Sequence, residues 1–366
     1  MKKTLALVLA SLMVATLAAC GSKTEAPASS SAAETPAASA SEAPAAESKA
    51  DASNISVGAC IYKFDDTFMT GVRNNMTAAS KELGATLEIV DSQNKQPTQN
   101  EQVDTYITKG VSALAVNPVD RTAAGPLVEK AKAESLPIVF LNREPEADVM
   151  KSYDKVWYVG AKAEESGTMS GQIIADYFKA NPGADKNKDG KIQYVMLQGE
   201  PGHQDATLRS EFSIKAIEAA GFGADKLGAD TAMWDKVKAT DLMKTFIASN
   251  GLDKIEAVLA NNDDMALGAI EALKAEGFNT GDPAKYIPVA GVDATAPALE
   301  AMKDGSLLGT VLNDGKNQGV ATVNIAVAAA QGKEINKETV GYDVTDGKYV
   351  WIPYVKVTAE NYKDFM

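Results

Sequence analysis

The segment ISVGACIYKFDDTF, residues 55–68, contains the pattern that decides the fold. Its first half is a short apolar run typical of a buried strand, and Asp65, Asp66 and Phe68 follow where that strand ends. Similar apolar runs alternate with amphipathic stretches along the rest of the chain. Because strands alternate with helices, the pattern predicts right-handed β-α-β units and therefore parallel sheets.

About ten apolar runs are expected to be strands, which is too many for one small core. We therefore predict an α/β fold with two domains, each built on a doubly wound, Rossmann-like parallel sheet. The expected strands are residues 55–62, 85–90, 112–116, 137–141, 155–160, 192–197, 226–233, 256–261, 287–292 and 307–313. The expected helices are residues 68–83, 100–109, 122–133, 206–220, 236–249, 265–276 and 297–303.

Polar side chains follow many of these strands, in VFLNREP, MLQGEPGHQDATLR, VLANNDDM, VAGVDA and TVLND as well as in the opening segment. Ligands of open α/β sheets bind beyond the carboxyl ends of the strands, so these residues are candidates for a binding site. Helix capping is the alternative, and it accounts well for Asp263 or Asp264. It accounts poorly for Asn142 and Arg143, which precede Glu-Pro.

The net charge of −13 over 366 residues argues against nucleic acid or an anionic membrane surface as a partner. Residues 1–19 have the charged-then-apolar layout of a signal peptide, and LAAC before Gly21 resembles a bacterial lipobox. That resemblance implies cleavage before Cys20 and lipid attachment to its sulfur; a plain signal peptide is the alternative. Residues 20–53 are expected to be a disordered, lipid-anchored linker, because residues 22–53 contain no aromatic residue, Val, Ile or Leu. Cys60 is then left without a disulfide partner and is expected to be an inert small hydrophobe.

The segment DKNKDGKIQ, residues 185–193, resembles the first nine positions of an EF-hand calcium loop, with Gly190 at the sharp turn. The twelfth position is Met196 in place of the usual glutamate, and an apolar strand stands where the exit helix would begin. A solvated polar turn is the alternative interpretation.

Residues 55–357 resemble the bacterial galactose/glucose-binding proteins, type I periplasmic binding proteins that serve ABC sugar importers. The resemblance rests on YKFDDTFM, VFLNREP, KNKDGKIQ, GEPGHQDA, DTAMWD and GTVLNDGKNQ, among other segments. It implies two lobes joined by a hinge of three crossing segments. The N-terminal sugar-binding lobe would comprise residues 55–160 and 315–348, and the C-terminal lobe residues 161–314 and 349–366.

The same resemblance implies a set of sugar contacts at the strand ends. They are Asp66, Phe68, Asn142, Arg143, His203, Asp205, Arg209, Trp234, Asn262, Asp293 and Asn313. Arg143 departs from the lysine that the family often has, and Gln204 replaces a common proline, a change expected to alter the loop more than the contacts.

These residue types suit a neutral pyranose. Phe68 and Trp234 would cover the two apolar faces of the ring, one from each lobe. Carboxylates and amides would accept hydrogen bonds from the hydroxyls, while guanidinium and amide groups donate. A lone histidine such as His203 is more often a structural or surface residue than a ligand contact. Aromatic residues beside strands, such as Phe68 and Trp234, usually fill cores.

The resemblance also supplies the carboxylate that the calcium loop lacks. Glu256, from a neighbouring strand, would contribute two oxygens to a structural Ca²⁺. The other implied ligands are the side-chain oxygens of Asp185, Asn187, Asp189 and Gln193 and the carbonyl oxygen of Lys191.

The expected function is that of an extracytoplasmic lipoprotein, monomeric and held at the cell membrane by its lipid, that captures D-galactose or D-glucose and delivers it to an ABC permease. No catalytic residue is expected. The alternative is a sugar sensor whose closed form is read by a chemoreceptor or a histidine kinase. A glycosidase would need a leaving-group acid that the pattern does not offer. A repressor effector domain is excluded by the signal peptide and by the lack of a basic helix-turn-helix stretch.

Overall fold

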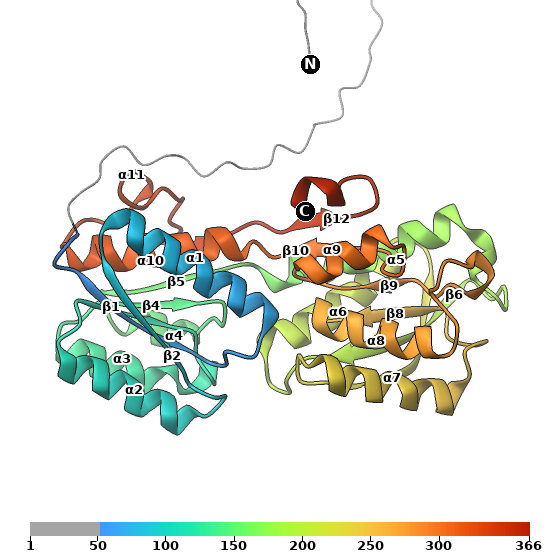
Figure 1. Cartoon of the computed structure of the whole chain (residues 1–366), viewed down its shortest axis with the longest axis horizontal. Coiled ribbons are helices and arrows are strands. Elements are labelled where there is room, and N and C mark those ends of the chain that lie inside the picture. Colours follow the sequence, from blue (N-terminus) through green and yellow to red (C-terminus); the bar gives the residue numbers. More distant parts are fainter. Residues whose placement is uncertain (1–51) are drawn as a thin grey trace, which may run out of the picture. The chain divides into compact units, whose positions relative to one another are not determined.

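The computed structural model describes residues 52–366, so the signal peptide, Cys20 and nearly all of the expected linker lie outside the described residues. Two parallel sheets form the centres of two lobes (Figure 1). The first sheet has the strand order β11-β5-β4-β3-β1-β2, and the second has the order β7-β6-β8-β9. A short antiparallel pair, β10 with β12, is bridged to the second sheet through Asp293 and Leu312. The prediction of two parallel α/β domains is confirmed.

The strands are β1 (Ser56–Ile61), β2 (Thr86–Asp91), β3 (Ala113–Val116), β4 (Ile138–Leu141), β5 (Val156–Gly160), β6 (Lys191–Gln198), β7 (Gly223–Thr231), β8 (Ala257–Ala260), β9 (Val289–Ala290), β10 (Thr310–Leu312), β11 (Tyr349–Trp351) and β12 (Val355–Val357). The α-helices are α1 (Thr67–Leu83), α2 (Gln96–Lys109), α3 (Ala124–Ala133), α4 (Ala147–Lys151), α5 (Ala163–Ala180), α6 (Gln204–Ala219), α7 (Lys236–Asn250), α8 (Asp263–Ala275), α9 (Ala296–Lys303), α10 (Gly315–Ala330) and α11 (Lys337–Val340).

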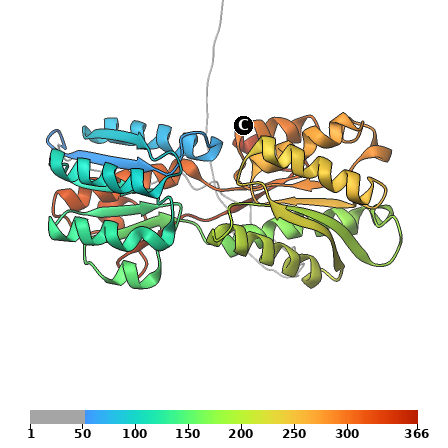
Figure 2. The ribbon, with the colours of Figure 1, turned by 90° about the horizontal axis from the view of Figure 1, so that it is seen from below.

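Helices cover both faces of each sheet (Figure 2), so inner strands such as β3, β4 and β8 are apolar and buried throughout, whereas the edge strands β2 and β7 carry charged, partly exposed residues. Alternate residues of β1 and β3 enter two separate cores of the first lobe. One core lies under α1 and α10 and contains Ala59 and Ala115, and the other lies under α2 and α3 and contains Cys60 and Leu114. Burial raises the pKa of the Cys60 thiol to about 12. An inert role for this cysteine follows.

The chain passes between the lobes three times, after β5, between β10 and α10, and between β11 and β12. The last boundary differs from the prediction, because residues 349–351 were assigned to the C-terminal lobe. These residues form β11, which pairs with β5 in the first sheet, where Tyr349 lies beside Tyr158. The crossing therefore falls after Trp351. Hydrogen bonding to a strand 190 residues earlier leaves no mark on local periodicity.

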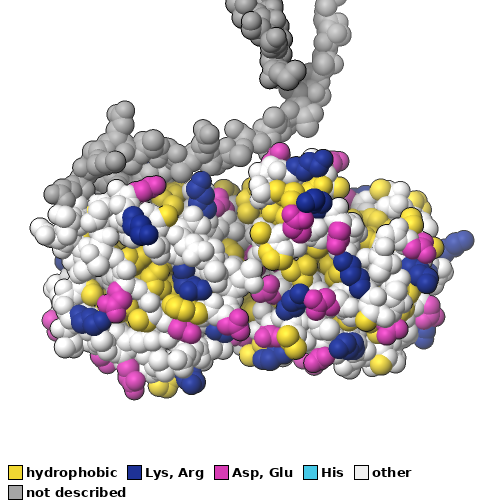
Figure 3. Space-filling model, viewed as in Figure 1, with side chains coloured by type: hydrophobic (Ala, Val, Ile, Leu, Met, Phe, Trp, Pro, Cys, Tyr) yellow, Lys and Arg dark blue, Asp and Glu magenta, His cyan; other side chains and the backbone are white. Residues whose placement is uncertain are grey.

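The helices α5 and α10 and the strands β11 and β12 were not among the predicted elements. The helix α10 is rich in Ala and Val and buried on most sides, so its sequence lacks the polar face that marks an amphipathic helix. None of the helices in residues 52–366 is long and apolar enough to cross a membrane. On the face shown in Figure 3, acidic and basic side chains are interspersed over both lobes.

Candidate functional site: a polar pocket between the lobes

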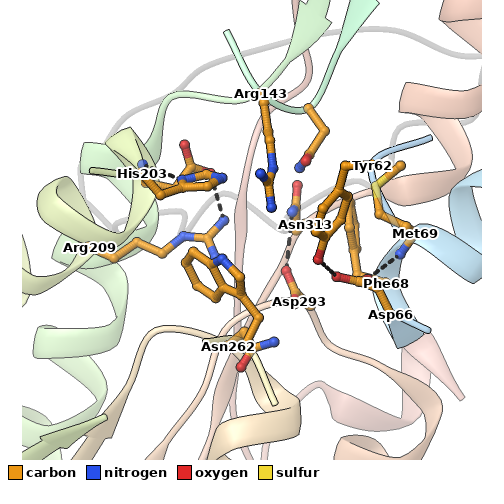
Figure 4. Close-up of a pocket in the computed structure, with 13 residues that line it drawn as sticks. Tyr62, Asp66, Phe68, Met69, Arg143, His203, Arg209, Asn262, Asp293 and Asn313 are labelled. Atoms are coloured by element: carbon orange, nitrogen blue, oxygen red, sulfur yellow. Dashed lines mark hydrogen bonds and ion pairs between the residues drawn. The ribbon is translucent and has the colours of Figure 1, made fainter. Parts of the chain in front are cut away.

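The polar strand ends of both lobes meet in one pocket, with an empty volume of about 360 Å³ (Figure 4). All of the residues that the sequence nominated as sugar contacts line it, together with Tyr62 and Met69. The lining residues are Tyr62, Asp66, Phe68, Met69, Asn142, Arg143, His203, Asp205, Arg209, Trp234, Asn262, Asp293 and Asn313. Tyr62 and Met69 are the two lining residues that the sequence did not nominate.

On the side of the first lobe, Asp66 is held by two donors. Its Oδ1 accepts the backbone N–H of Met69 at 2.7 Å, which makes Asp66 the N-cap of α1, and its Oδ2 accepts the hydroxyl of Tyr62. Asp66 therefore caps α1 and also lines the pocket. The cap places Phe68 in the first turn of α1, where it lines the pocket.

Tyr62 also contacts a second pocket residue, Arg143. The guanidinium of Arg143 lies over its ring at 3.7 Å from the centroid, a cation–π contact. Arg143 Nη1 donates to the carbonyl of Val119 at 2.6 Å, so the group is fixed before any ligand arrives. Its neighbour Asn142 adopts a left-handed conformation with φ of 62°, and its Oδ1 accepts from Asn117 Nδ2 at 3.1 Å. The side-chain NH₂ group of Asn142 is left as a donor.

Arg209 is the most constrained cation of the second lobe, with a side chain 5% exposed. Its guanidinium donates to Asp205 Oδ2 at 3.1 Å, to the carbonyl of Asn261 at 2.8 Å and to the hydroxyl of Tyr354 at 3.0 Å. The backbone around Arg209 packs directly on α5, where a Cβ on Gly167 would lie 2.8 Å from the Arg209 carbonyl oxygen. Burial outweighs the attraction of Arg209 and raises the pKa of Asp205.

His203 caps α6 through its ring: Nδ1 accepts the backbone N–H of Asp205 at 3.1 Å. Burial, together with Arg143 and Arg209, lowers the pKa of His203 well below 6.5. The ring is therefore neutral at pH 7, and because Nδ1 accepts, the proton resides on Nε2. His203 can thus offer a donor to a bound molecule without adding charge.

Trp234 lies edge-on to His203, with ring centroids 5.1 Å apart. Its backbone is left-handed, with φ of 59°, and the indole presses against the end of β6, where a Cβ on Gly199 would meet it at 2.0 Å. Any other residue at Gly199 would displace the ring. Among the described residues, the indole Nε1 of Trp234 has no hydrogen-bond partner although it is buried.

The remaining wall consists of Asn262, Asp293 and Asn313. Asn262 caps α8, its Oδ1 accepting the backbone N–H of Met265 at 3.0 Å, so its NH₂ group remains for a ligand. The prediction that Asp263 or Asp264 caps this helix is wrong. Asp293 accepts from Asn313 Nδ2 at 3.2 Å, and burial, opposed by Arg209, raises the pKa of Asp293 well above its usual value.

Several contacts join the two lobes around the pocket. Arg143 Nη2 pairs with Glu200 Oε2 at 2.9 Å, with side chains only 4% and 14% exposed. On the opposite side, the hydroxyl of Thr67 contacts both carboxylate oxygens of Asp264, at 2.9 and 3.0 Å. The lobes are therefore in contact across the pocket.

Gln204 adds a further contact between the lobes, since its Nε2 donates to Glu144 Oε2 at 3.2 Å. A proline at this position could not make it. The expectation that this substitution mainly alters the loop is thus incomplete.

The predicted calcium loop lies at the amino end of β6, where Gly190 has φ of 75°. Glu256 reaches it from the start of the neighbouring strand β8, as expected: its Oε1 accepts the backbone N–H of Lys186 at 2.6 Å, and its Oε2 that of Gln193 at 3.2 Å. Burial raises the pKa of Glu256. Asp189 accepts from Gln193 Nε2 at 2.9 Å.

The side chains of this loop determine whether it can hold Ca²⁺. Each nominated side chain carries a carboxylate or amide oxygen, and the buried Oε1 of Gln193 has no hydrogen-bond partner among the described residues, so the oxygens present fit the ion. In residues 52–366, no group of three or more His, Cys, Asp or Glu side chains is arranged to hold a metal by itself. Amide and carbonyl oxygens would have to complete any shell.

Two α/β lobes that enclose a pocket of opposed donors and acceptors define a solute-binding protein, a class in which the site lies between the domains and no bond is broken. The chain belongs to the family described as "periplasmic binding protein domain", whose sequence profile matches residues 57–334. Its relatives are sugar-binding transport proteins rather than enzymes.

Individual relatives agree with this assignment. The chain is 44% identical over 316 residues to the D-galactose/methyl-galactoside binding periplasmic protein MglB of Haemophilus influenzae, covering 86% of this chain and 93% of that one. It is 28% identical to the ribose import binding protein RbsB of Bacillus subtilis, covering 77% and 84%. Among solved structures, an ABC transporter solute binding protein from Bacillus halodurans with bound myo-inositol superposes with a TM-score of 0.72 at 32% identity, covering 86% and 98%.

Proposed function

We propose that this protein captures D-galactose or D-glucose in the pocket between its lobes and delivers the sugar to an ABC importer at the membrane. The observation that carries the proposal is the convergence of the whole nominated residue set, from both lobes, on one pocket.

The chemistry of the pocket favours an uncharged polyhydroxyl ring. Asp66, Asp205 and Asp293 supply acceptors, and Arg143 and Arg209 supply charged donors, so the opposing charges nearly cancel. Each hydroxyl of a sugar both donates and accepts, and it therefore matches a lining that alternates the two. Charge-assisted hydrogen bonds of this kind contribute about 1.5–3 kcal/mol each.

Two of the aromatic side chains in the lining favour a pyranose. Phe68 comes from the first lobe and Trp234 from the second, and both line the pocket. Apolar C–H faces of a sugar ring packed on aromatic rings gain burial and a fixed orientation. The free Nε1–H of Trp234 adds a donor at the ring edge.

Anchoring by lipid at Cys20 is part of the same proposal and is supported by the sequence LAAC at the end of the signal peptide. A protein held at the outer face of the cell membrane keeps captured sugar near its permease. Radiolabelled palmitate incorporation into the wild-type chain, and its loss in Cys20→Ser, would test this directly. A sensory role, in which the closed form contacts a chemoreceptor or histidine kinase, is compatible with the same pocket.

We further propose that the loop of residues 185–193 and Glu256 bind a structural Ca²⁺. The support is the carboxylate and amide oxygens of the loop, the buried carboxylate of Glu256 against it, and the unpartnered Gln193 Oε1. The ion would join the loop to the edge of the second sheet and would take no part in sugar chemistry.

The proposal of sugar capture is tested by isothermal titration calorimetry of the purified full chain against a panel of D-galactose, D-glucose, D-ribose, L-arabinose and myo-inositol. We expect saturable one-to-one binding of D-galactose or D-glucose, tighter than that of the pentoses. Tightest binding of ribose or myo-inositol would contradict the assigned sugar class.

A further inference from the structure

Asp263 is a buried carboxylate that the pocket itself does not use. It is the first residue of α8, its side chain is 0% exposed, and it directly follows the pocket residue Asn262. Asn262 caps the helix, so capping does not explain Asp263. A buried carboxylate is costly unless it is hydrogen-bonded, which directs attention to its partners.

All of those partners hold the loop that carries Asp293. Asp263 Oδ1 accepts the hydroxyl of Thr310 at 2.6 Å, and Oδ2 accepts the backbone N–H of Thr295 at 2.8 Å. The backbone N–H of Asp263 donates to the carbonyl of Val292 at 2.8 Å. Thr310 Oγ1 in turn accepts the backbone N–H of Ala294 at 3.3 Å. The residues on both sides of Asp293 are therefore fastened to Asp263, directly or through Thr310.

The loop needs such support because its backbone is strained. Asp293 has φ of 122° and Ala294 has φ of 52°, and neither is glycine. Such conformations persist only where the surroundings impose them. The Asp263 carboxylate also packs against the end of β9, where a Cβ on Gly291 would lie 2.3 Å from Asp263 Oδ1.

We propose that Asp263 is a positioning residue for sugar recognition: it holds the strained loop so that the Asp293 carboxylate faces the pocket at a fixed distance from Asn262. This inference rests on the proposed function for its binding readout. It assigns Asp263 no contact with the sugar, and its whole effect passes through Asp293.

The test is a double-mutant cycle measured by calorimetry with D-galactose and D-glucose. Asp263→Ala leaves Thr295 and Thr310 without their acceptor, and we expect the Kd to rise about 10- to 100-fold. Asp263→Asn keeps an acceptor for Thr295, so its Kd should stay within about 5-fold of the wild type. In an Asp293→Asn background, Asp263→Ala should change the Kd by less than about 3-fold, because the residue it positions is already altered.

A merely structural role for Asp263 predicts a different result. The two substitutions would then be additive, and additivity would overturn the inference. Asn279→Asp is the matched control: Asn279 is buried in the same lobe, its NH₂ donates to the carbonyls of Ile287 and Ser306, and it lies outside the pocket. This control should lower the melting temperature while leaving the Kd within 2-fold. If its Kd rises as much as that of Asp263→Ala, loss of stability alone explains both.

A readout independent of sugar separates this inference from the proposed function. In a crystal structure of the Asp263→Ala variant, we expect the 293–295 loop to relax from its positive φ values and Asp293 to turn away from Asn313. An unchanged loop would overturn the inference even if the wild type binds hexose. A relaxed loop in a protein that binds neither hexose would support the inference and refute the proposed function.

Discussion

The ion pair between Arg143 and Glu200 makes a strong prediction about affinity, because it bridges the lobes beside the pocket. Pocket residues such as Arg209 and Asp293 are 5% and 7% exposed, so a sugar can reach them only if the lobes separate first. The pair at 2.9 Å therefore forms as the lobes close, and its free energy adds to that of sugar binding. We choose Glu200→Gln, which keeps the shape of the side chain and removes its charge.

The expected size of the effect follows from the contacts of Glu200. Its Oε2 pairs with Arg143, and its Oε1 accepts from Asn94 Nδ2 at 3.0 Å. Glutamine can accept only one of these donors, so one charge-assisted hydrogen bond is lost, about 1.5–3 kcal/mol. Because the glutamate is only 14% exposed, solvent screens little of this. At about 1.4 kcal/mol for each factor of ten, the Kd should rise about 10- to 150-fold.

Calorimetry gives the Kd, and stopped-flow measurement of tryptophan fluorescence gives the dissociation rate, where most of the change should appear. The control is Glu211→Gln, whose partner Lys215 lies at 2.6 Å but whose pair is about half exposed, so less than a 2-fold change is expected. A Kd for Glu200→Gln within 2-fold of the wild type would refute the reasoning. It would show that contacts between the lobes do not contribute to capture.

Three further predictions follow from single side chains. Asp66→Asn keeps the cap of α1 but loses the carboxylate, so calorimetry should detect no hexose binding while the melting temperature changes little; full affinity would contradict the assigned pocket. His203, the only histidine in the sequence, should show an NMR titration midpoint below pH 6.5, because burial and the charges of Arg143 and Arg209 lower its pKa well below that value. The unfolded chain takes up a proton at His203 near pH 6.5, whereas the folded chain does so only at lower pH. The free energy of unfolding should therefore fall by up to about 1.4 kcal/mol per pH unit as the pH falls below 6.5. A ring that titrates near 6.5 would be inconsistent with this. Glu256→Gln should lower the free energy of unfolding by up to about 2.7 kcal/mol more in calcium at 100 times its Kd than in chelator, where only a hydrogen bond to the loop backbone is lost; equal losses in both conditions would mean that Glu256 does not bind the ion.

Several features of the pocket could be predicted from the chain alone because they depend on local order. Polar residues follow apolar runs, and parallel strands bring their carboxyl ends to one edge of a sheet, so Asp66 and Asn142 were expected near each other. The carboxylate of Glu256 was expected beside the calcium loop only from the resemblance to sugar-binding proteins, and the pairing of β6 with β8 is what places it there. The resemblance to sugar-binding proteins then nominated the remaining contacts residue by residue.

Tyr62 and Met69 were missed, although they stand in the same segment as Asp66. Tyr62 is the first residue after β1, a position where a tyrosine usually fills core, and only its contacts with Asp66 and Arg143 reveal its place in the pocket. Met69 is a buried residue of α1, and nothing in its spacing separates it from the core residues Val72 and Met76.

What the sequence determined by itself is the alternation of strands and helices, the doubly wound class of the two sheets and the residue types that gather at the strand ends. These depend on hydrophobic periodicity, which acts over a few residues at a time. Only the tertiary structure decided that β11 returns to the first sheet, that Glu200 pairs with Arg143 across the lobes, and that Asp263 holds the loop of Asp293. Those contacts join residues that are 30 to 190 positions apart, and their geometry follows from how the packed lobes meet, which no local pattern specifies.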